Sequence, residues 1–455
     1  MTRCKIVVRS QNVLPNNVNL AFTTSQSEMR ATWYTVNQTV GAVRFSSQQF
    51  SADTADSVDM SLSPSTFTEY GEFPGWSGFV NTAVMSNLNA LQQYFYQVGD
   101  SQQNLWSPVY NFTTGAGATT FKPFSFNVFG DMGGGDYMDT VHNLLENTNR
   151  FDWTLHVGDI AYADYSEKDL ESGNTKSHSH SHSHVEGGLQ SGMLGNMTVW
   201  NEFMKSITPL SSMQSYMVCI GNHDVFYNKS AYSASWLMPS ESPAQTWYAF
   251  DYNGVHFVAI STENSYTYGS EQYTWLENHL QQFRESNPDT WLIAYAHRPF
   301  YCTSIIMQWC YGNHTGALFN TYDPLFQKYN VDIFIAGHTH AYERTYPVYE
   351  NKVMGSFEEP KGTVYIAVGV GGNWEGLDPL FDPFKPEWSA HRHTYLGYGI
   401  LNVVNQTHIN WEFNRAIDNK VSDSFWMNKG TFLNYYIYLY INTNCFSQLN
   451  NTINI

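Results

Sequence analysis

From residue 124 onward, short and almost continuous apolar runs alternate with longer segments of helical character. The apolar runs read FSFNVF, WTLHV, YMVCI, WLIAYA and VDIFIAG, and the helical segments include MDTVHNLLENT and YTWLENHLQQFRE. Near-continuous apolar strands belong to a sheet that is covered on both faces, and helices between the strands supply that cover. The alternation therefore predicts an α/β domain.

Each of the five apolar runs is followed, where it ends, by polar residues that are able to bind a metal ion. In chain order these residues are Asp131, Asp159, Tyr162, Asn222, His223, Asp224, His297, His338 and His340. In open α/β sheets, ligands bind beyond the carboxyl ends of the strands, so we expect these side chains to meet at one edge. Four of the ligand positions are preceded by glycines that allow tight turns and close approach, at Gly130, Gly158, Gly221 and Gly337.

Each of these signals is weak on its own. A lone GHxH or GNHD is more often a turn with a hydrogen-bonded histidine than a metal site, and a lone Tyr162 is as well explained by a core phenol. Asp159 and Tyr162 follow the same run, where they are either a cap and a packing aromatic or two hard oxygen ligands of one ion. The occurrence of all five blocks in one chain favours metal binding.

Residues 1–118 have a different character. Short β-rich runs (VNLAFTT, MRATWYTV, AVRFSS, YFYQVGD and VYNFTT) are separated by turn residues, which is typical of an all-β sandwich. No constellation of histidines, cysteines or carboxylates occurs there, so this domain is expected to support the site rather than to contribute to it. The tract TTGAGATTFKP is the expected linker into a catalytic domain at residues 122–425, and residues 426–455 are expected to form a tail.

A polar insertion at residues 167–192 contains the tract SHSHSHSH at 177–184. We favour a solvated low-complexity loop over accessory metal binding by these imidazoles. The four histidines have no neighbours of defined geometry, so they are not counted among the catalytic residues.

The charge balance argues against nucleic acid as a binding partner. Lys and Arg number 22 against 40 Asp and Glu, a net charge of −18, and no basic run is present that could follow a nucleic-acid backbone. No membrane span is expected either, because the late apolar run FLNYYIYLYI is well short of the roughly 20 residues that cross a bilayer.

Cysteines and glycosylation sequons bear on the compartment. The five cysteines cannot all pair within one chain; Cys302 and Cys310 are the plausible bridge, and Cys219 lies in an apolar run as a small buried residue. Seven N-x-[ST] sequons begin at Asn37, Asn111, Asn196, Asn228, Asn313, Asn405 and Asn450. Together they favour a secreted protein or one of the lysosomal or endomembrane lumen, although no signal peptide is visible.

Taken as a set, the five blocks resemble those of the calcineurin-like metallophosphoesterases and, within them, the purple acid phosphatases. The resemblance covers roughly residues 12–425, from PNNVNLAF to beyond GHTHAYERTYPVYENK. Asp131-Met132-Gly133 replaces the D-x-H of general metallophosphoesterases, and Tyr162 in the second block is the purple acid phosphatase variant. The resemblance implies an α/β metallophosphoesterase sandwich of two mixed sheets flanked by helices, preceded by an all-β, fibronectin-III-like sandwich domain.

The resemblance also implies a binuclear metal centre. The first site would hold Fe(III) through Asp131, Tyr162, His340 and one oxygen of Asp159. The second site would hold Zn(II), Fe(II) or Mn(II) through Asn222, His297, His338 and the bridging Asp159. Two carboxylates and a phenolate suit the hard ferric ion, whereas two imidazoles and an amide suit a divalent ion.

A mechanism follows from such a centre. A phosphate monoester would contact both ions, and a metal-bound hydroxide would attack phosphorus in line with the leaving alcohol, even at acidic pH. His223 is the candidate catalytic residue that contacts the phosphate and protonates the leaving oxygen. Asp224 either orients His223 or caps the turn, the role we favour. Arg298 and His314 are not assigned. Arg298 is as well explained by a structural salt bridge as by contact with the phosphate, and His314 lies within a sequon.

The favoured function is an acid phosphatase that acts on small phosphate monoesters. A phosphodiesterase or nucleotide pyrophosphatase would use the same metals, since loops around the site determine the substrate. A non-catalytic metal-binding surface protein is a third reading, against which the intact ligand set argues. A homodimer, formed through a sandwich edge or through a cysteine outside the bridge, is left open.

Overall fold

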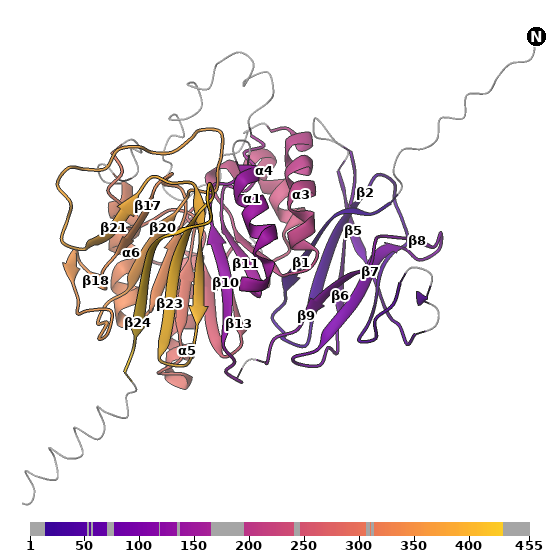
Figure 1. Ribbon diagram of the computed structural model, residues 1–455, viewed down its shortest axis with the longest axis horizontal. Helices are drawn as coiled ribbons and strands as arrows, with labels where there is room; N and C mark the ends of the chain where they lie inside the picture. Colours follow the sequence, from indigo (N-terminus) through magenta and orange to yellow (C-terminus); the bar gives the residue numbers. More distant parts are fainter. Residues whose placement is uncertain are drawn as a thin grey trace, which may run out of the picture.

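The computed structural model describes residues 14–51, 54–55, 58–70, 77–117, 119–133, 137–164, 195–240, 246–305, 310 and 314–430. A pair of N-terminal β-sheets lies beside a larger α/β region (Figure 1). The His-rich insertion expected at 167–192 and most of the expected tail lie outside the described residues. Among the described helices, none has the length and apolar character needed to cross a membrane.

The N-terminal region is a β-sandwich, as predicted. One sheet has the order β1-β2-β6-β5, and the other has the order β4-β3-β7-β8 with β9 also paired to β7. Trp33, Val43 and Tyr96 are among the buried residues of its core. The strands are β1 Asn16–Phe22, β2 Met29–Thr35, β3 Gly41–Ser46, β4 Ser61–Pro64, β5 Thr66–Tyr70, β6 Gly78–Met85, β7 Gln93–Asp100, β8 Leu105–Trp106 and β9 Tyr110–Thr113.

This sandwich packs directly against the α/β region. Asn17 Nδ2 donates a hydrogen bond to the carbonyl of Asn201 at 3.1 Å, and Ser211 Oγ donates to the carbonyl of Val18 at 2.8 Å. Ala21 and Tyr34 belong to the same buried cluster as the core of the α/β region. Residues of the sandwich therefore contribute to the apolar core of the α/β region, in addition to the separate core inside the sandwich.

The α/β region contains two mixed sheets, as the fold class predicts. The first sheet has the order β12-β11-β10-β22-β23-β24, and the second has the order β13-β14-β15-β16-β20-β17-β21. The strands are β10 Phe124–Phe129, β11 Trp153–Val157, β12 Tyr216–Cys219, β13 Tyr248–Tyr252, β14 Val255–Ala259, β15 Leu292–Tyr295, β16 Ile333–Ala336, β17 Tyr342–Thr345, β20 Val364–Val368, β21 Ser389–His393, β22 Gly397–Val403, β23 His408–Arg415 and β24 Val421–Asn428, with a small hairpin of β18 Val348–Tyr349 and β19 Lys352–Val353.

Helices cover the two sheets. They are α1 Tyr137–Glu146, α3 Met197–Ser211, α4 Phe226–Ser235, α5 Glu271–Ser286 and α6 His314–Lys328, with the short 3₁₀ turns η2 Thr148–Arg150 and η3 Asn222–Asp224. Trp200 of α3 is buried with residues of the first sheet, and Leu276 of α5 and Leu318 of α6 are buried against the second. Successive residues of β15 alternate between these clusters, since Ile293 joins the first and Leu292 the second.

The five predicted apolar strands are divided between the two sheets. β10, β11 and β12 are neighbouring parallel strands of the first sheet, and β15 and β16 are parallel neighbours in the second. Their carboxyl ends carry the candidate ligands of both sheets. The structure also differs from the expected end of the catalytic domain at residue 425, because β24 continues to Asn428 and buries Met427.

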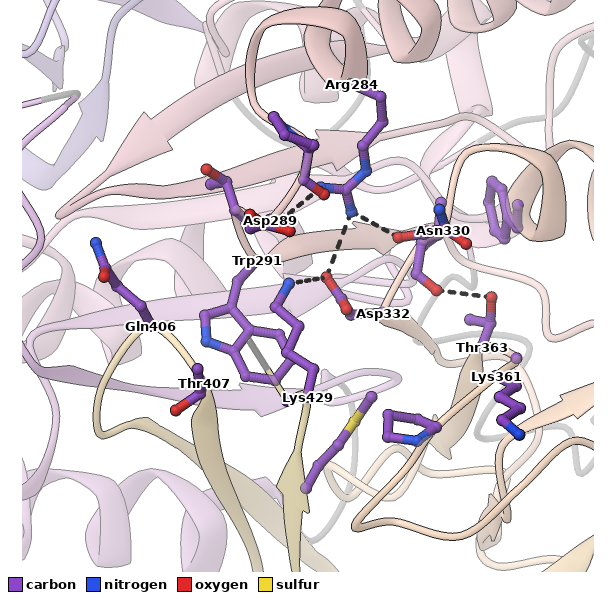
Figure 2. A pocket seen from close by; sticks show the side chains of 18 of the residues that line it. Arg284, Asp289, Trp291, Asn330, Asp332, Lys361, Thr363, Gln406, Thr407 and Lys429 are labelled. Carbon is purple, nitrogen blue, oxygen red and sulfur yellow. Dashed lines mark hydrogen bonds and ion pairs between the residues drawn. The ribbon is translucent and has the colours of Figure 1, made fainter. Parts of the chain in front are cut away.

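A cavity of about 470 Å³ lies at the amino ends of parallel strands of the second sheet, where Trp291 precedes β15 and Asp332 precedes β16 (Figure 2). Asp332 Oδ2 accepts hydrogen bonds from the backbone N–H of Leu292 at 2.8 Å and from Lys429 Nζ at 3.0 Å. It also lies 3.5 Å from Arg284 Nη2. One carboxylate thus balances two cations here, at the edge of the sheet opposite the candidate ligands.

Replacement of Asp332 by alanine is expected to lower the free energy of unfolding by about 3 kcal/mol, because it removes the carboxylate that the largely buried ammonium group of Lys429 contacts at 3.0 Å. The side chain of Asp332 is only 10 % exposed. Urea unfolding of Asp332→Ala measures the effect. Asp418→Ala removes a carboxylate from a more exposed pair with Arg415 and is expected to leave the midpoint nearly unchanged. Equal midpoints for both variants would show that the buried carboxylate is not needed.

Candidate metal centre

The first group of predicted ligands converges from three strand ends. Tyr162 Oη lies 3.2 Å from Asp131 Oδ1 and 3.0 Å from His340 Nε2. His340 Nε2 lies 3.4 Å from Asp131 Oδ1, and all three side chains are buried. Three donor atoms that the sequence places after β10, β11 and β16 therefore face one another.

A second group lies around Asp159. Its Oδ2 is 3.0 Å from His297 Nε2, which is itself 3.1 Å from Asn222 Oδ1. Asp159, His297 and His338 each offer one ligand atom, and these three atoms all lie within 4.8 Å of one another. The structure thus brings together all seven residues predicted to bind metal, in two adjacent groups.

Carbonyl groups orient two of the imidazoles. His297 Nδ1 lies 3.0 Å from the carbonyl oxygen of Val157, and His340 Nδ1 lies 3.0 Å from that of Gly376. An Nδ1–H that donates to a carbonyl leaves the lone pair on Nε2, which in both residues is the nitrogen that faces the other donors. Such second partners are typical of histidines that bind metal.

Backbone strain is concentrated in the same residues. Four of the seven candidate ligands have positive φ angles: Asp131 at 58°, Asp159 at 53°, Tyr162 at 50° and His338 at 65°. Residues other than glycine are rarely held in the left-handed region, and such strain is found mainly at functional sites.

At two of the predicted glycine positions, the side chain of a candidate ligand lies too close to the backbone to leave room for a Cβ atom. Gly158 has a φ of 82°, and a Cβ there would lie 2.6 Å from Nδ1 of His297. A Cβ at Gly221 would lie 2.2 Å from Oδ1 of Asp159. Any other residue at either position would displace a candidate ligand.

His223 lies beside the two groups, and its position depends on a residue that the sequence reasoning missed. Its Nδ1 is 2.8 Å from Asp164 Oδ2, and its backbone N–H donates to Asp159 Oδ1 at 2.8 Å. Burial alone would lower the pKa of His223, but the carboxylates of Asp164 and Asp159 outweigh it and raise that pKa well above its usual range. Asp164 follows Tyr162 by two residues, and no local pattern distinguishes it from a solvated carboxylate.

Asp224 caps the turn, which is the role we favoured for it. Its carboxylate accepts hydrogen bonds from the backbone N–H groups of Gly221, Asp159 and Ile160, each at 2.9 Å. These bonds connect the loops after β11 and β12. Asp164, rather than Asp224, is the carboxylate that contacts the His223 ring.

Arg298 forms a structural salt bridge, which was one of the two interpretations of this residue. Its Nε and Nη2 donate to the two carboxylate oxygens of Glu263 at 2.7 and 2.9 Å, and its Nη1 lies 3.2 Å from His338 Nε2. Burial would raise the pKa of Glu263, but Arg298 holds it below its usual range. Glu263 comes from the loop after β14 and was not predicted.

The loop after β20 supplies two further neighbours of the candidate ligand His340. Asn373 Nδ2 lies 3.3 Å from His340 Nε2, and Glu375 Oε2 lies 3.8 Å from the same nitrogen. The sequence signal was present, since β20 is one more apolar run that ends in glycines and polar residues, VYIAVGVGGN. The side chain of His314, at the start of α6, lies outside the described part of the chain.

The cysteine predictions are confirmed. Cys302 and Cys310 form a disulfide, with their Cα atoms 5.4 Å apart. Cys310 Sγ lies 3.5 Å from the hydroxyl of Thr339, the residue between His338 and His340. Cys219 is free and buried. The bridge therefore supports the loop that carries two candidate ligands.

Comparison with known proteins agrees with this geometry. Three family models match the chain: "Purple acid Phosphatase, N-terminal domain" at residues 15–114, "Calcineurin-like phosphoesterase" at 124–342, and "Iron/zinc purple acid phosphatase-like protein C" at 362–424. The chain is 30 % identical over 438 residues to acid phosphatase type 7 of Homo sapiens, covering 91 % of this chain and 90 % of the relative. The chain belongs to the purple acid phosphatase family.

Two further matches extend the family likeness. Acid phosphatase type 7 of Mus musculus is 29 % identical over 446 residues, covering 91 % of both chains. The structure of a purple acid phosphatase from yellow lupin seeds shares the fold with a TM-score of 0.76 at 22 % identity, covering 92 % of this chain and 75 % of that one. The predicted family and fold are confirmed. As a purple acid phosphatase, the chain is a metal-dependent phosphoric monoester hydrolase of the metallophosphoesterase type.

Proposed function

We propose that the two groups of donor atoms bind the two metal ions of an acid phosphatase. Fe(III) would be held by Asp131, Tyr162, His340 and Asp159. Zn(II), Fe(II) or Mn(II) would be held by Asn222, His297, His338 and Asp159. The observation that carries this proposal is the convergence of Tyr162, Asp131 and His340 within 3.4 Å of one another, beside the cluster around Asp159.

The donor chemistry fits this assignment. Burial and the carboxylates of Asp131 and Asp159 raise the pKa of Tyr162 well above its usual range, so the protein alone favours the neutral phenol. A phenol surrounded by carboxylates becomes a good ligand only beside a strongly charged cation, which stabilises the phenolate. Fe(III) is a cation of this kind, whereas the imidazoles and amide of the second group suit a divalent ion.

When bound, the two cations would neutralise charge on the phosphate and activate water for attack at acidic pH. The chain itself supplies the proton for the leaving group. Asp164 holds Nδ1 of His223, and the Nε2 of the same ring lies 3.9 Å from Asp159 Oδ2, on the side of the candidate metal ligands. His223 would donate its Nε2 proton to the ester oxygen as the bond to phosphorus breaks.

The proposed substrates are small phosphate monoesters. Steady-state turnover of p-nitrophenyl phosphate and of bis(p-nitrophenyl) phosphate by the metal-loaded protein tests this point. We expect a higher kcat/KM for the monoester. A preference for the diester would favour the phosphodiesterase alternative, and hydrolysis of neither by a protein that binds metal would favour the non-catalytic alternative.

The replacement of Tyr162 by phenylalanine tests the first metal site. The concentrated, iron-loaded protein is expected to show a broad visible absorption band from phenolate-to-Fe(III) charge transfer, and Tyr162→Phe is expected to lose it. Tyr216→Phe is the matched control, since Tyr216 is equally buried but bonds to Nδ1 of His156 at 2.9 Å. A band that persists in Tyr162→Phe, or an iron-loaded wild type without colour, would refute the assignment.

We also propose that the protein acts in a secretory or lysosomal lumen. The disulfide between Cys302 and Cys310 supports this location, because structural disulfides persist in oxidising compartments. The sequons at Asn37 and Asn405 are exposed, so glycans could be accommodated there. Mass spectrometry of the protein from its native source, before and after enzymatic removal of glycans, would test the location.

A further inference from the structure

Two imidazoles meet on the outer face of the second sheet, away from the candidate metal ligands. His256 lies on β14 and His279 on α5, and their Nε2 atoms are 2.8 Å apart. Asp251 of β13 places Oδ1 2.7 Å from Nδ1 of the same His256. We propose that His256 and His279 form a binding site for a divalent cation of the Zn(II) class, which fastens α5 to the β13–β14 hairpin.

Asp251 prepares His256 to act as a ligand. A carboxylate that accepts the Nδ1–H of an imidazole leaves the lone pair on Nε2, which is the carboxylate–histidine arrangement common at zinc sites. The ring is buried and lies parallel to Phe283, with centroids 3.9 Å apart. Both contacts hold the Nε2 of His256 toward α5.

His279 is held in a similar way and remains neutral under acidic conditions. Its ring stacks on Trp275, one helical turn earlier, with centroids 5.1 Å apart. Burial, together with the neighbouring His256, lowers the pKa of His279 to about 4. A neutral imidazole keeps the lone pair that a metal ion requires, and Zn(II), Cu(II) and Ni(II) are the cations that imidazoles bind well.

The spacing of the two nitrogens is close to that of a metal site. Zn–N bonds of about 2.0–2.1 Å place two nitrogens about 3.3 Å apart on a tetrahedral ion. The observed separation of 2.8 Å corresponds to a direct N–H···N hydrogen bond. Opening the pair by about 0.5 Å, through rotation of the partly exposed His279, would admit the ion, with water in the remaining positions. His279 would then carry its proton on Nδ1 instead of Nε2, without net release of a proton.

The test uses the full-length protein loaded with its catalytic metals, in which the tract histidines 178, 180, 182 and 184 are replaced by asparagine. Calorimetric titration with Zn(II) is expected to show one further equivalent bound, and thermal unfolding is expected to shift upward with added Zn(II). His279→Ala is expected to abolish both effects and to leave phosphatase activity unchanged. His142→Ala removes an exposed histidine on α1 and is expected to retain both effects.

Two further variants complete the test. Asp251→Asn keeps the side-chain shape but loses the charged acceptor, and is expected to weaken Zn(II) binding by about 10–100-fold. His279→Gln replaces His279→Ala if the alanine variant fails to fold. Absence of the extra equivalent, or its persistence in the His279 variant, would show that the pair is only hydrogen-bonded. Because activity is measured separately, failure here would leave the proposed phosphatase function intact.

Discussion

His223→Ala is expected to lower kcat for a phosphate monoester by about 10²–10⁴-fold, the usual contribution of a positioned general acid. The metal content is expected to stay at the wild-type level, because His223 is not among the proposed ligands. The physical reason is the position of the ring, held by Asp164 at 2.8 Å and stacked on Tyr162 with centroids 4.3 Å apart.

The leaving group distinguishes proton donation from simple phosphate contact. A residue that protonates the leaving oxygen matters most when that oxygen is strongly basic, so His223→Ala should impair an alkyl phosphate more than p-nitrophenyl phosphate. Equal losses for both substrates would reduce His223 to a phosphate contact. Unchanged turnover of both would remove it from the mechanism.

Asp164→Asn separates orientation from protonation. The amide retains the size of the carboxylate but not its charge, so it supports the imidazolium of His223 less well. We expect a smaller loss of kcat than in His223→Ala, with little change in KM, and no additional loss when both substitutions are combined. Additive losses would mean that Asp164 acts independently of His223.

Ligands of open α/β sheets bind beyond the carboxyl ends of the strands, which explains why the candidate metal ligands could be predicted to lie together and the residues that support them could not. Asp131, Asp159 and His297 follow apolar runs directly, so their place at the carboxyl edge follows from the strand pattern. Asp164 and Glu263 act through contacts with residues distant in the sequence, and their local surroundings resemble those of any loop carboxylate. Their roles depend on how the loops fold, which periodicity does not encode.

Among the strands, too, some could be recognised from the sequence and others could not. The strands β10, β11, β15 and β16 are almost entirely buried and mostly apolar, which made them recognisable. β4 has the sequence SLSP and is mostly exposed, so it carries no apolar pattern. The presence of two sheets was expected only from the family resemblance. The assignment of β10, β11 and β12 to one sheet and of β15 and β16 to the other was not predicted, because strand order depends on pairings that apolar runs do not specify.

Asp159→Asn is expected to lower kcat by at least about 10³-fold, because the proposed bridging ligand would lose its charge and with it several kcal/mol of metal-dependent stabilisation. The variant is nearly isosteric, and its amide oxygen can still accept the 2.8 Å hydrogen bond from the backbone N–H of His223. The fold should therefore persist, which circular dichroism checks. The effect should appear in metal affinity rather than in stability.

Metal analysis after dialysis gives the sharper result, because a bridging ligand and a single-site ligand differ in how many ions they hold. Asp159→Asn is expected to reduce both metals together, whereas Asn222→Ala, a change confined to the second group, should reduce the divalent ion and retain the iron. The 3.0 Å contact between Asp159 Oδ2 and His297 Nε2 places Asp159 in the second group. Full retention of iron in Asp159→Asn would therefore confine Asp159 to the second site and refute the bridge.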